Sequence, residues 1–223
     1  MNLQKNAFLP IKPPFQTKTQ LPLPANISIS HYLNSNSLKK PRFPRATANG
    51  NDETVMPSMS EILEASRAQK VDLQLKTVGP FFRITVKSMV TDAELGRAEG
   101  FVRFWMGGRI LHLDSIKLRR ETLGMEKSIF GLGLFIGAVA IRHGYDSSCK
   151  TAQLLAINDS DLYHSKLVRF YTRLGFKAVY EVTGSSVGDV AHMLVWGGVG
   201  TRMDASVEEL MIKWCTRFKT PHK

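Results

Sequence analysis

The sequence predicts an α/β protein with a mixed, mostly antiparallel central sheet that is flanked by helices. Three observations indicate this class. Segments with the two-residue period of strands fill the first half of the globular part, and strands alternate with helical segments in the second half. Two adjacent glycines, Gly107-Gly108, join two of the strands as a hairpin turn. Strands that alternate with helices are typical of a sheet covered by helices.

The globular part begins at Ser58, and its first half holds one helix and four strands. Ser58 is followed three residues later by Glu61, which is the pattern of a capping box, so a helix is expected from there to about residue 70. Alternation of apolar and polar residues predicts the strands that follow, at 73–78, 82–90, 98–106 and 109–118.

A glycine-containing segment opens the second half. Residues 127–144 are expected to be a loop that passes into a helix and stops at Gly144. A short apolar strand follows at 152–159, and a second helix at 161–174.

Two further strands and one helix complete the expected fold. The strands are expected at 177–183 and 191–196. A C-terminal amphipathic helix is expected at 204–218, with Asp204 as its N-cap and an apolar face that packs on the sheet or on a second copy of the chain.

Residues 1–50 differ in composition from the rest of the chain. Seven of the ten prolines lie in the first 45 residues, and residues 1–51 contain seven Lys or Arg and no Asp or Glu. A basic, acid-free and hydroxyl-bearing segment is typical of organelle import signals. We expect a disordered transit peptide over residues 1–50 that directs the protein to the chloroplast, with the stroma as its compartment. A mitochondrion is the second choice, and a tail without a targeting role is the alternative.

The overall charge does not indicate a nucleic-acid-binding protein. The net charge of +11 comes mostly from residues 1–51, and the other 172 residues hold 23 basic and 19 acidic side chains. Specific binding of nucleic acid is therefore not expected. The two cysteines lack metal-ligand spacing, so we expect free thiols and no metal site. The longest apolar run, 129–141, is too short to span a bilayer, and no transmembrane segment is expected.

The helix at 161–174 ends on a recognisable cap. Its apolar residues fall on one continuous face, and Gly175 follows at the position where a left-handed residue closes a helix. In a Schellman cap, Phe176 would pack back on Tyr171. Helix termination alone therefore accounts for Tyr171, Leu174, Gly175 and Phe176.

The order and spacing of three motifs suggest a family. YTRLGF at 171–176 resembles the Tyr-x-x-Leu-Gly-Phe signature of the GNAT acyl-CoA N-acyltransferase superfamily. In that family the signature follows a glycine loop with its helix and then a buried strand, which here are SIFGLG (128–133) and QLLAIND (153–159). The chain has Ser128 where the family usually has Arg or Gln. The resemblance covers about residues 95–197 and implies a divergent, organelle-targeted member with a GNAT-like domain at 58–223.

The resemblance implies acetyl-CoA as the co-substrate. A loop that enters a helix N-terminus offers unpaired N–H groups to the pyrophosphate, and glycines let the backbone approach it. Lys127, Arg119 and Arg120 could add positive charge. The alternative is that Gly131, Gly133 and Gly137 only allow the helix to pack closely on the sheet. The predicted cofactor-binding residues are Leu118, Ser128, Ile129, Phe130, Gly131, Leu132, Gly133 and Asn158.

Acyl transfer to an amine needs a base for the ammonium proton and an acid for the departing thiolate. The resemblance implies Tyr171 as the acid and a carboxylate on the strand before the glycine loop as the base. Asp114 holds that place, and Glu99 is the alternative. Tyr171 could instead be a core residue, and Asp114 a strand residue bound to a backbone amide. His164, where the family often has Asn, is expected to be inert.

Two functions remain open from the sequence. The first is an acetyl-CoA-dependent N-acetyltransferase acting on a protein or small-molecule amine in the plastid. The second is a catalytically silent GNAT-like scaffold or assembly factor for a plastid protein complex. The second is favoured by the connection Gly79-Pro80, which is too short for the helices that usually shape the amine site in this family. A protein partner or a homodimer would then be expected.

Overall fold

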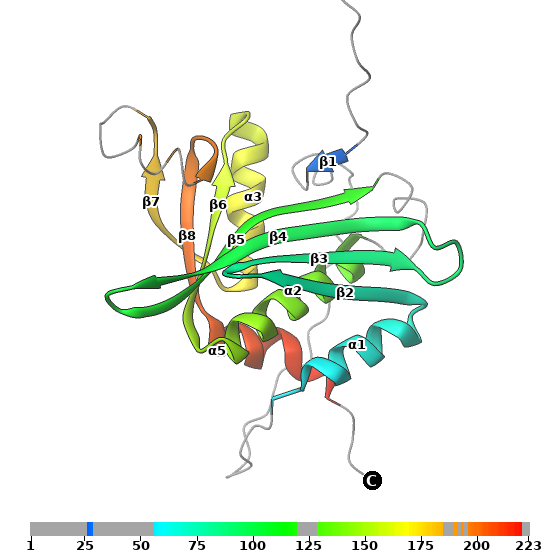
Figure 1. Ribbon diagram of the computed structural model, residues 1–223. Coiled ribbons are helices and arrows are strands. Elements are labelled where there is room, and N and C mark those ends of the chain that lie inside the picture. Colours follow the sequence, from blue (N-terminus) through cyan, green and yellow to red (C-terminus); the bar gives the residue numbers. More distant parts are fainter. Residues whose placement is uncertain are drawn as a thin grey trace, which may run out of the picture.

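The structure is a computed structural model that describes residues 26–28, 56–119, 129–184, 190, 193 and 196–219. Its centre is one mixed sheet with the strand order β2-β3-β4-β5-β6-β8-β7, and β1 pairs with β5 beside this series (Figure 1). Among the described strands, β5 and β6 are the one parallel pair. The predicted fold class, a mixed and mostly antiparallel sheet flanked by helices, is confirmed.

The strands lie close to their predicted positions in the first half of the chain. Their bounds are β1 (Asn26–Ser28), β2 (Val71–Val78), β3 (Phe81–Ser88), β4 (Glu94–Trp105), β5 (Gly108–Arg119), β6 (Cys149–Ile157), β7 (Lys177–Val182) and β8 (Gly200–Ser206).

The helices are α1 (Met59–Ala68), α2 (Ile129–Asp146), α3 (Asp161–Leu174) and α5 (Val207–Leu210). A π-helical turn η3 (Met211–Cys215) and a 3-10 turn η4 (Thr216–Phe218) continue α5. The capping box that the sequence predicts for α1 is present. The Glu61 amide donates to the Ser58 Oγ at 3.2 Å, and the Ser58 amide donates to the Glu61 carboxylate at 2.7 Å.

The long helices pack against the same face of the sheet. Leu111 of β5, Ala152 of β6 and Ala205 of β8 are neighbours in the strand register, so their side chains share that face. Gly144 of α2 lies against Leu111, and α3 reaches Thr201, which is on the same side of β8 as Ala205. Residues from the strands and from all four helices form one continuous hydrophobic core here.

The expected boundaries of α2 were wrong at both ends. The helix begins at Ile129, so Gly131 and Gly133 lie in its first turns rather than in a loop before it. It continues past Gly144 to Asp146. A Cβ on Gly144 would meet the Leu111 side chain at 2.8 Å, so only glycine lets the helix pack this closely on β5. Close packing rather than helix termination therefore explains this glycine.

We expect Gly144→Val to lower the free energy of unfolding by about 1–3 kcal/mol, because Leu111 is fully buried and cannot move aside. Gly137→Ala is the matched control in the same helix. A Cβ there meets no described atom within 4 Å, so removal of a helical glycine should stabilise by up to about 1 kcal/mol. Urea unfolding of both variants measures the difference, and equal effects would show that the contact with Leu111 is unimportant.

Two predictions for the C-terminal part were wrong. Asp204 does not cap a helix, because it lies inside β8, and the helix begins at Val207 with Ser206 as its N-cap. The Asp204 carboxylate instead accepts hydrogen bonds from Gln153 and Arg202. Within the expected strand at 191–196, the described residues Met193 and Trp196 are helical instead, and the other four residues lie outside the described part.

The predicted end of α3 is confirmed in detail. Gly175 has a φ of 114°, and its amide donates to the Thr172 carbonyl at 3.0 Å. The Phe176 amide donates to the Tyr171 carbonyl at 3.0 Å, and the two rings are 6.0 Å apart. These are the two bonds and the apolar contact of a Schellman cap.

The described part of the N-terminal segment is strand β1. Asn26, Ile27 and Ser28 pair with Arg119, Leu118 and Lys117 of β5. These three residues form a strand within the segment for which a transit peptide is predicted. The remainder of that prediction lies outside the described residues.

Candidate functional site: the opening between β5 and β6

A β-bulge at Asp114 interrupts the pairing of β4 with β5. Glu99 pairs with Ser115, but the next residue, Gly100, pairs with Leu113, so Asp114 is the extra residue on β5. A bulge bends its strand, increases the local twist and changes the direction of the side chain that it carries. The sequence-predicted base therefore lies at the one irregular point of this long hairpin.

The two parallel strands separate at the same level. Their pairing ends at Leu113 of β5 and Leu154 of β6, one residue before the bulge. Beyond this point β6 continues beside β8 as far as Ile157, while β5 turns away from it (Figure 1). The facing edges of diverging strands leave backbone N–H and C=O groups without a partner across the gap. Such an opening can receive an extended ligand that carries amide groups.

Strand β1 occupies the outer part of this opening. The edge of β5 that faces away from β4 pairs with β1 at residues 117–119. Asp114, Ser115 and Ile116 have no strand partner on that edge among the described residues. The unoccupied length of the opening therefore begins at the bulge.

Helix α2 directs its N-terminus toward the open end. Gly144, near its C-terminus, contacts Leu111 of β5, and the helix begins fifteen residues earlier at Ile129. Fifteen helical residues span about 22 Å, which is close to the seven strand residues from Leu111 to Leu118. The N–H groups of the first turn lack helical acceptors and form the positive end of the helix dipole. They lie at the level where β5 and β6 are apart.

No described residue fills the space beside Gly131 and Gly133 in the first turns of α2. A Cβ built on Gly131 or Gly133 meets no described atom within 4 Å, and the same holds for Gly137. Close packing of the helix on the sheet therefore does not explain these three glycines, whereas it does explain Gly144. Open space next to free N–H groups is what a phosphate needs in order to approach a helix N-terminus.

The other predicted cofactor-binding residues lie in different parts of the chain. Leu118 is a buried residue of β5 that pairs with Gly96 of β4 and Ile27 of β1. Asn158 follows β6, and its backbone N–H donates to the Val199 carbonyl at 2.9 Å. Leu132 is a buried residue of α2. Ser128 and the basic residues Arg120 and Lys127 lie outside the described residues, and for Ile129 and Phe130 only the backbone is described.

Asp114 and its alternative Glu99 lie near each other on the strand pair. Burial raises the pKa of the Asp114 carboxyl above its usual range, and the negative charge of Glu99 raises it further, against a smaller opposite effect of Lys117. Glu99 is bound to Arg83, whose Nε donates to it at 2.7 Å. Because the Glu99 carboxylate is already bound to Arg83, Asp114 is the better candidate for the base.

Tyr171 lies about 15 Å along α3 from the first residue of that helix, Asp161. Since α3 packs along β6, that distance corresponds to about four or five strand residues, so Tyr171 is about level with the middle of β6. Its ring is partly buried against the core and contacts Phe170 and Phe176. Burial raises the pKa of Tyr171 to about 12, so the phenol stays protonated at neutral pH, as a proton donor must.

The opposite face of the sheet carries a polar cluster that the sequence reasoning missed. Gln153 of β6 accepts from Arg103 and donates to Asp204, which also binds Arg202. Beside it, the buried His112 ring is stacked between Phe101 and Trp196, at centroid distances of 4.2 and 3.9 Å. Burial and the charges of Arg103 and Arg202 lower the pKa of His112 to about 4, so it is neutral. This cluster fixes the strands on either side of the opening.

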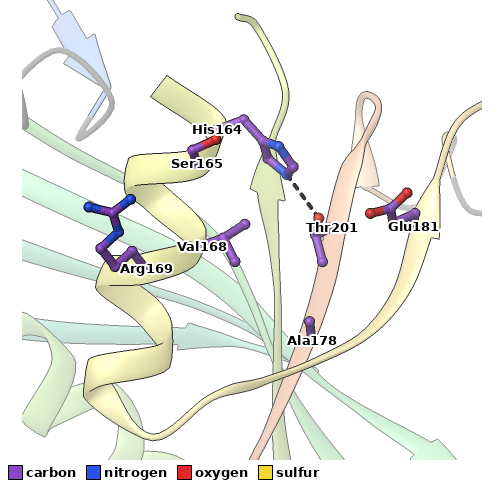
Figure 2. A pocket seen from close by; sticks show the side chains of 7 residues that line it. All are labelled: His164, Ser165, Val168, Arg169, Ala178, Glu181 and Thr201. Atoms are coloured by element: carbon purple, nitrogen blue, oxygen red, sulfur yellow. Dashed lines mark hydrogen bonds between the residues drawn. The ribbon is translucent and has the colours of Figure 1, made fainter. Parts of the chain in front are cut away.

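A separate hollow of about 380 Å³ lies between α3 and the pair β7–β8 (Figure 2). Figure 2 shows His164 directed at Thr201, and their side chains are hydrogen-bonded at 2.8 Å. Glu181 of β7 lies beyond Thr201, while Arg169 projects from the other side of α3. None of the lining residues comes from β5 or α2, so this hollow is distinct from the opening. His164 has a defined partner here, which the sequence did not indicate.

Other kinds of site find no support in the part of the chain that the structure describes. No three His, Cys, Asp or Glu side chains gather there as metal ligands. Cys149 and Cys215 are buried free thiols, as predicted. None of the described helices is both long and apolar enough to cross a bilayer.

No family model matches the chain, and no curated protein matches it. Among solved structures it is similar to nourseothricin acetyltransferase, with 12% identity over 62% of this chain and 85% of that one and a TM-score of 0.41. It is similar to apo FdhC, a nucleotide-linked sugar GNAT (9% identity, 70% of each chain, TM-score 0.42). A third is aminoglycoside 6'-N-acetyltransferase complexed with coenzyme A (14% identity, 56% of this chain and 73% of that one, TM-score 0.37). Each is a likeness of fold at low identity, so what this chain can do depends on its own residues.

Proposed function

We propose that the protein is an acetyl-CoA-dependent N-acetyltransferase that acts on a protein or small-molecule amine in the plastid stroma. One observation carries the proposal: the bulge at Asp114 and the separation of β5 from β6 occur at one level, and α2 begins beyond them, about level with Leu118 toward the same end of β5. Acetyl-CoA has a pyrophosphate for the helix N-terminus and an extended arm with two amides for the strand edges.

The residues at the opening can perform the proton transfers that amide formation needs. Asp114 accepts the proton of the substrate ammonium, and the free amine nitrogen attacks the thioester carbonyl. The C–N bond forms as the C–S bond breaks, and Tyr171 donates its phenolic proton to the departing thiolate. The second proton that the nitrogen loses passes to the Tyr171 phenolate, which restores the phenol and leaves a neutral amide. The neutral phenol and the ionised carboxylate are the states that each role requires.

The pH dependence of the rate is expected to follow Asp114. Because only the ionised carboxylate accepts a proton, kcat/KM should rise with pH through a pKa above the usual carboxyl range. Glu99→Gln removes a negative charge beside Asp114 and should move this acid limb to lower pH. Lys117→Gln removes a positive charge and should move it to higher pH. Rate profiles of both variants check the assignment, and shifts in the same direction would contradict it.

The activity itself is tested with isotope-labelled acetyl-CoA and three classes of acceptor: peptides with free N-termini, lysine peptides blocked at the N-terminus, and small polyamines. Mass spectrometry of the products is expected to show a single acetyl group on the amine of one class. If none of the three is acetylated above the uncatalysed rate by a chain that binds acetyl-CoA, the scaffold function becomes the better explanation.

The catalytically silent scaffold is favoured by one specific observation. Between β2 and β3 the chain has only the turn Gly79-Pro80, and α1 packs on α2 at the helix-covered face, so no described helix shapes an amine site. A scaffold would retain its partner in pull-downs from organelle extract when Tyr171→Phe and Asp114→Asn are combined. A monomer that acetylates amines and has no stable partner would contradict this alternative.

The plastid location rests on the composition of residues 1–50. A fusion of residues 1–50 to a fluorescent protein should accumulate in the stroma of plant cells and should be shortened near Arg45. Accumulation in mitochondria would replace the plastid by the second choice, and an unshortened cytosolic fusion would remove the targeting role.

A further inference from the structure

Two hairpin turns at one end of the sheet expose apolar side chains. Val78 and Phe81 flank the β2–β3 turn and are 78% and 60% exposed. Phe104, Trp105 and Met106 form the end of the β4–β5 hairpin and are 73%, 65% and 99% exposed. These five residues are called the apolar tip below.

The two turns are neighbours, and the second one projects beyond the first. The Val102 amide donates to the Pro80 carbonyl at 2.9 Å, and the rings of Phe81 and Phe101 are 5.8 Å apart. Strand β3 starts opposite Phe101, so the last four residues of β4 continue past its end. Figure 1 shows this hairpin extending away from the helices. The β4–β5 part of the apolar tip therefore protrudes beyond the neighbouring turn.

Positive charge surrounds the apolar tip. The hairpin from Gly100 to Leu113 contains Arg103 and Arg109 and no acidic residue. The Arg109 guanidinium lies 4.8 Å from the Phe104 ring centre, and that of Arg103 lies 5.8 Å from the Trp105 ring centre. Two exposed lysines, Lys76 and Lys150, belong to the same end of the sheet. The positively charged groups therefore lie around the exposed rings at this end of the sheet.

We propose that the apolar tip docks on a membrane surface that contains anionic lipids. Convex turns with exposed aromatic rings can enter the boundary between lipid headgroups and acyl chains, where Trp and other aromatic residues are favoured. The exposed Arg109, Lys76 and Lys150 side chains remain at the level of the headgroup phosphates and are attracted by them. A protein partner would have to supply a pocket for each protruding ring, whereas a fluid bilayer adapts to their shape. The proposal is independent of the acetyltransferase activity.

Co-sedimentation of the full chain with vesicles tests the proposal. We expect binding to vesicles of phosphatidylglycerol with phosphatidylcholine, and at least tenfold weaker partitioning onto phosphatidylcholine alone. The variant Phe104→Ser/Trp105→Ser/Met106→Ser should reduce partitioning onto the anionic vesicles at least tenfold. Residues 1–51 are basic and attract anionic vesicles themselves. The decisive comparison is therefore between the triple variant and a control variant that both keep this segment.

The matched control is Met89→Ser/Val90→Ser, which removes exposed apolar side chains (56% and 73% exposed) from the turn at the opposite end of the sheet. It should leave partitioning unchanged, and thermal unfolding should show that both variants are folded. A blue shift of the tryptophan fluorescence on the anionic vesicles should disappear in Trp105→Phe. The proposal is overturned if the chain does not bind, if both multiple variants bind equally, or if the apolar tip instead mediates self-association that the triple variant abolishes.

Discussion

Replacing Gly131 with leucine is expected to weaken acetyl-CoA binding at least tenfold without lowering the free energy of unfolding. A side chain on Gly131 meets no described atom within 4 Å, so the fold can accept it. Loss of a helical glycine should even stabilise α2 by up to about 1 kcal/mol. The leucine would nevertheless fill the space through which a pyrophosphate reaches the N–H groups of the first turn. Calorimetric titration with acetyl-CoA should show at least a tenfold loss of affinity.

Gly137→Ala is the control for this effect, because it lies two helical turns further along α2 in equally open space. It should bind acetyl-CoA with unchanged affinity. If Gly131→Leu also binds normally, the space beside the helix N-terminus is not the anion site. If Gly131→Leu unfolds, Gly131 is required for the packing of α2.

Tyr171→Phe is expected to lower kcat by about a hundredfold or more, which is the usual contribution of a positioned proton donor. The phenyl ring preserves the contacts with Phe170 and Phe176 and lacks only the proton that the thiolate needs. Acetyl-CoA affinity and the thermal unfolding temperature should therefore change little. Single-turnover acetyl transfer separates the chemical step from cofactor binding.

The control for Tyr171→Phe is Tyr145→Phe, which removes a phenol from an exposed position at the end of α2. Its kcat should match that of the unchanged chain. An undiminished kcat in Tyr171→Phe would show that Tyr171 is a core residue and that the thiolate is protonated by another group or by water.

Much of the fold could be predicted because local patterns decide it. The capping box at Ser58 and the Schellman cap around Gly175 are made by residues adjacent in sequence, so their chemistry is visible without the tertiary structure. The alternating pattern of β2 and β3 is equally direct, since one of their faces is buried.

The errors occurred where tertiary contacts override local preference. Asp204 is a good N-cap residue, but here its carboxylate binds Gln153 and Arg202 within the sheet. The alternation of Thr201, Met203 and Ala205 with polar residues was the available signal for β8. Gly144 resembles a helix stop, but its role is to let α2 approach Leu111, which no local pattern reveals.

The candidate site was predictable in part. The resemblance to the GNAT signature identified Tyr171, Asp114 and the glycines. The structure places Asp114 at the opening and the glycines in the first turns of α2, and the roles of all of these residues stay predictions. The bulge has its own sequence signal. Apolar residues alternate up to Leu113 and resume at Ile116, so the period slips by one at Asp114. The separation of β5 from β6 depends on pairing between distant segments and required the structure.

Acetyl-CoA binding is expected to depend most directly on an anion site at the first turn of α2, and calorimetry with two ligands tests this site. Acetyl-CoA titrated into the full chain should bind saturably with one-to-one stoichiometry and a Kd below about 1 mM. Acetyl-pantetheine, which has the thioester and both amides but no pyrophosphate, should bind at least tenfold more weakly. Absence of acetyl-CoA binding up to millimolar concentration, or equal affinity for the two ligands, would contradict the account.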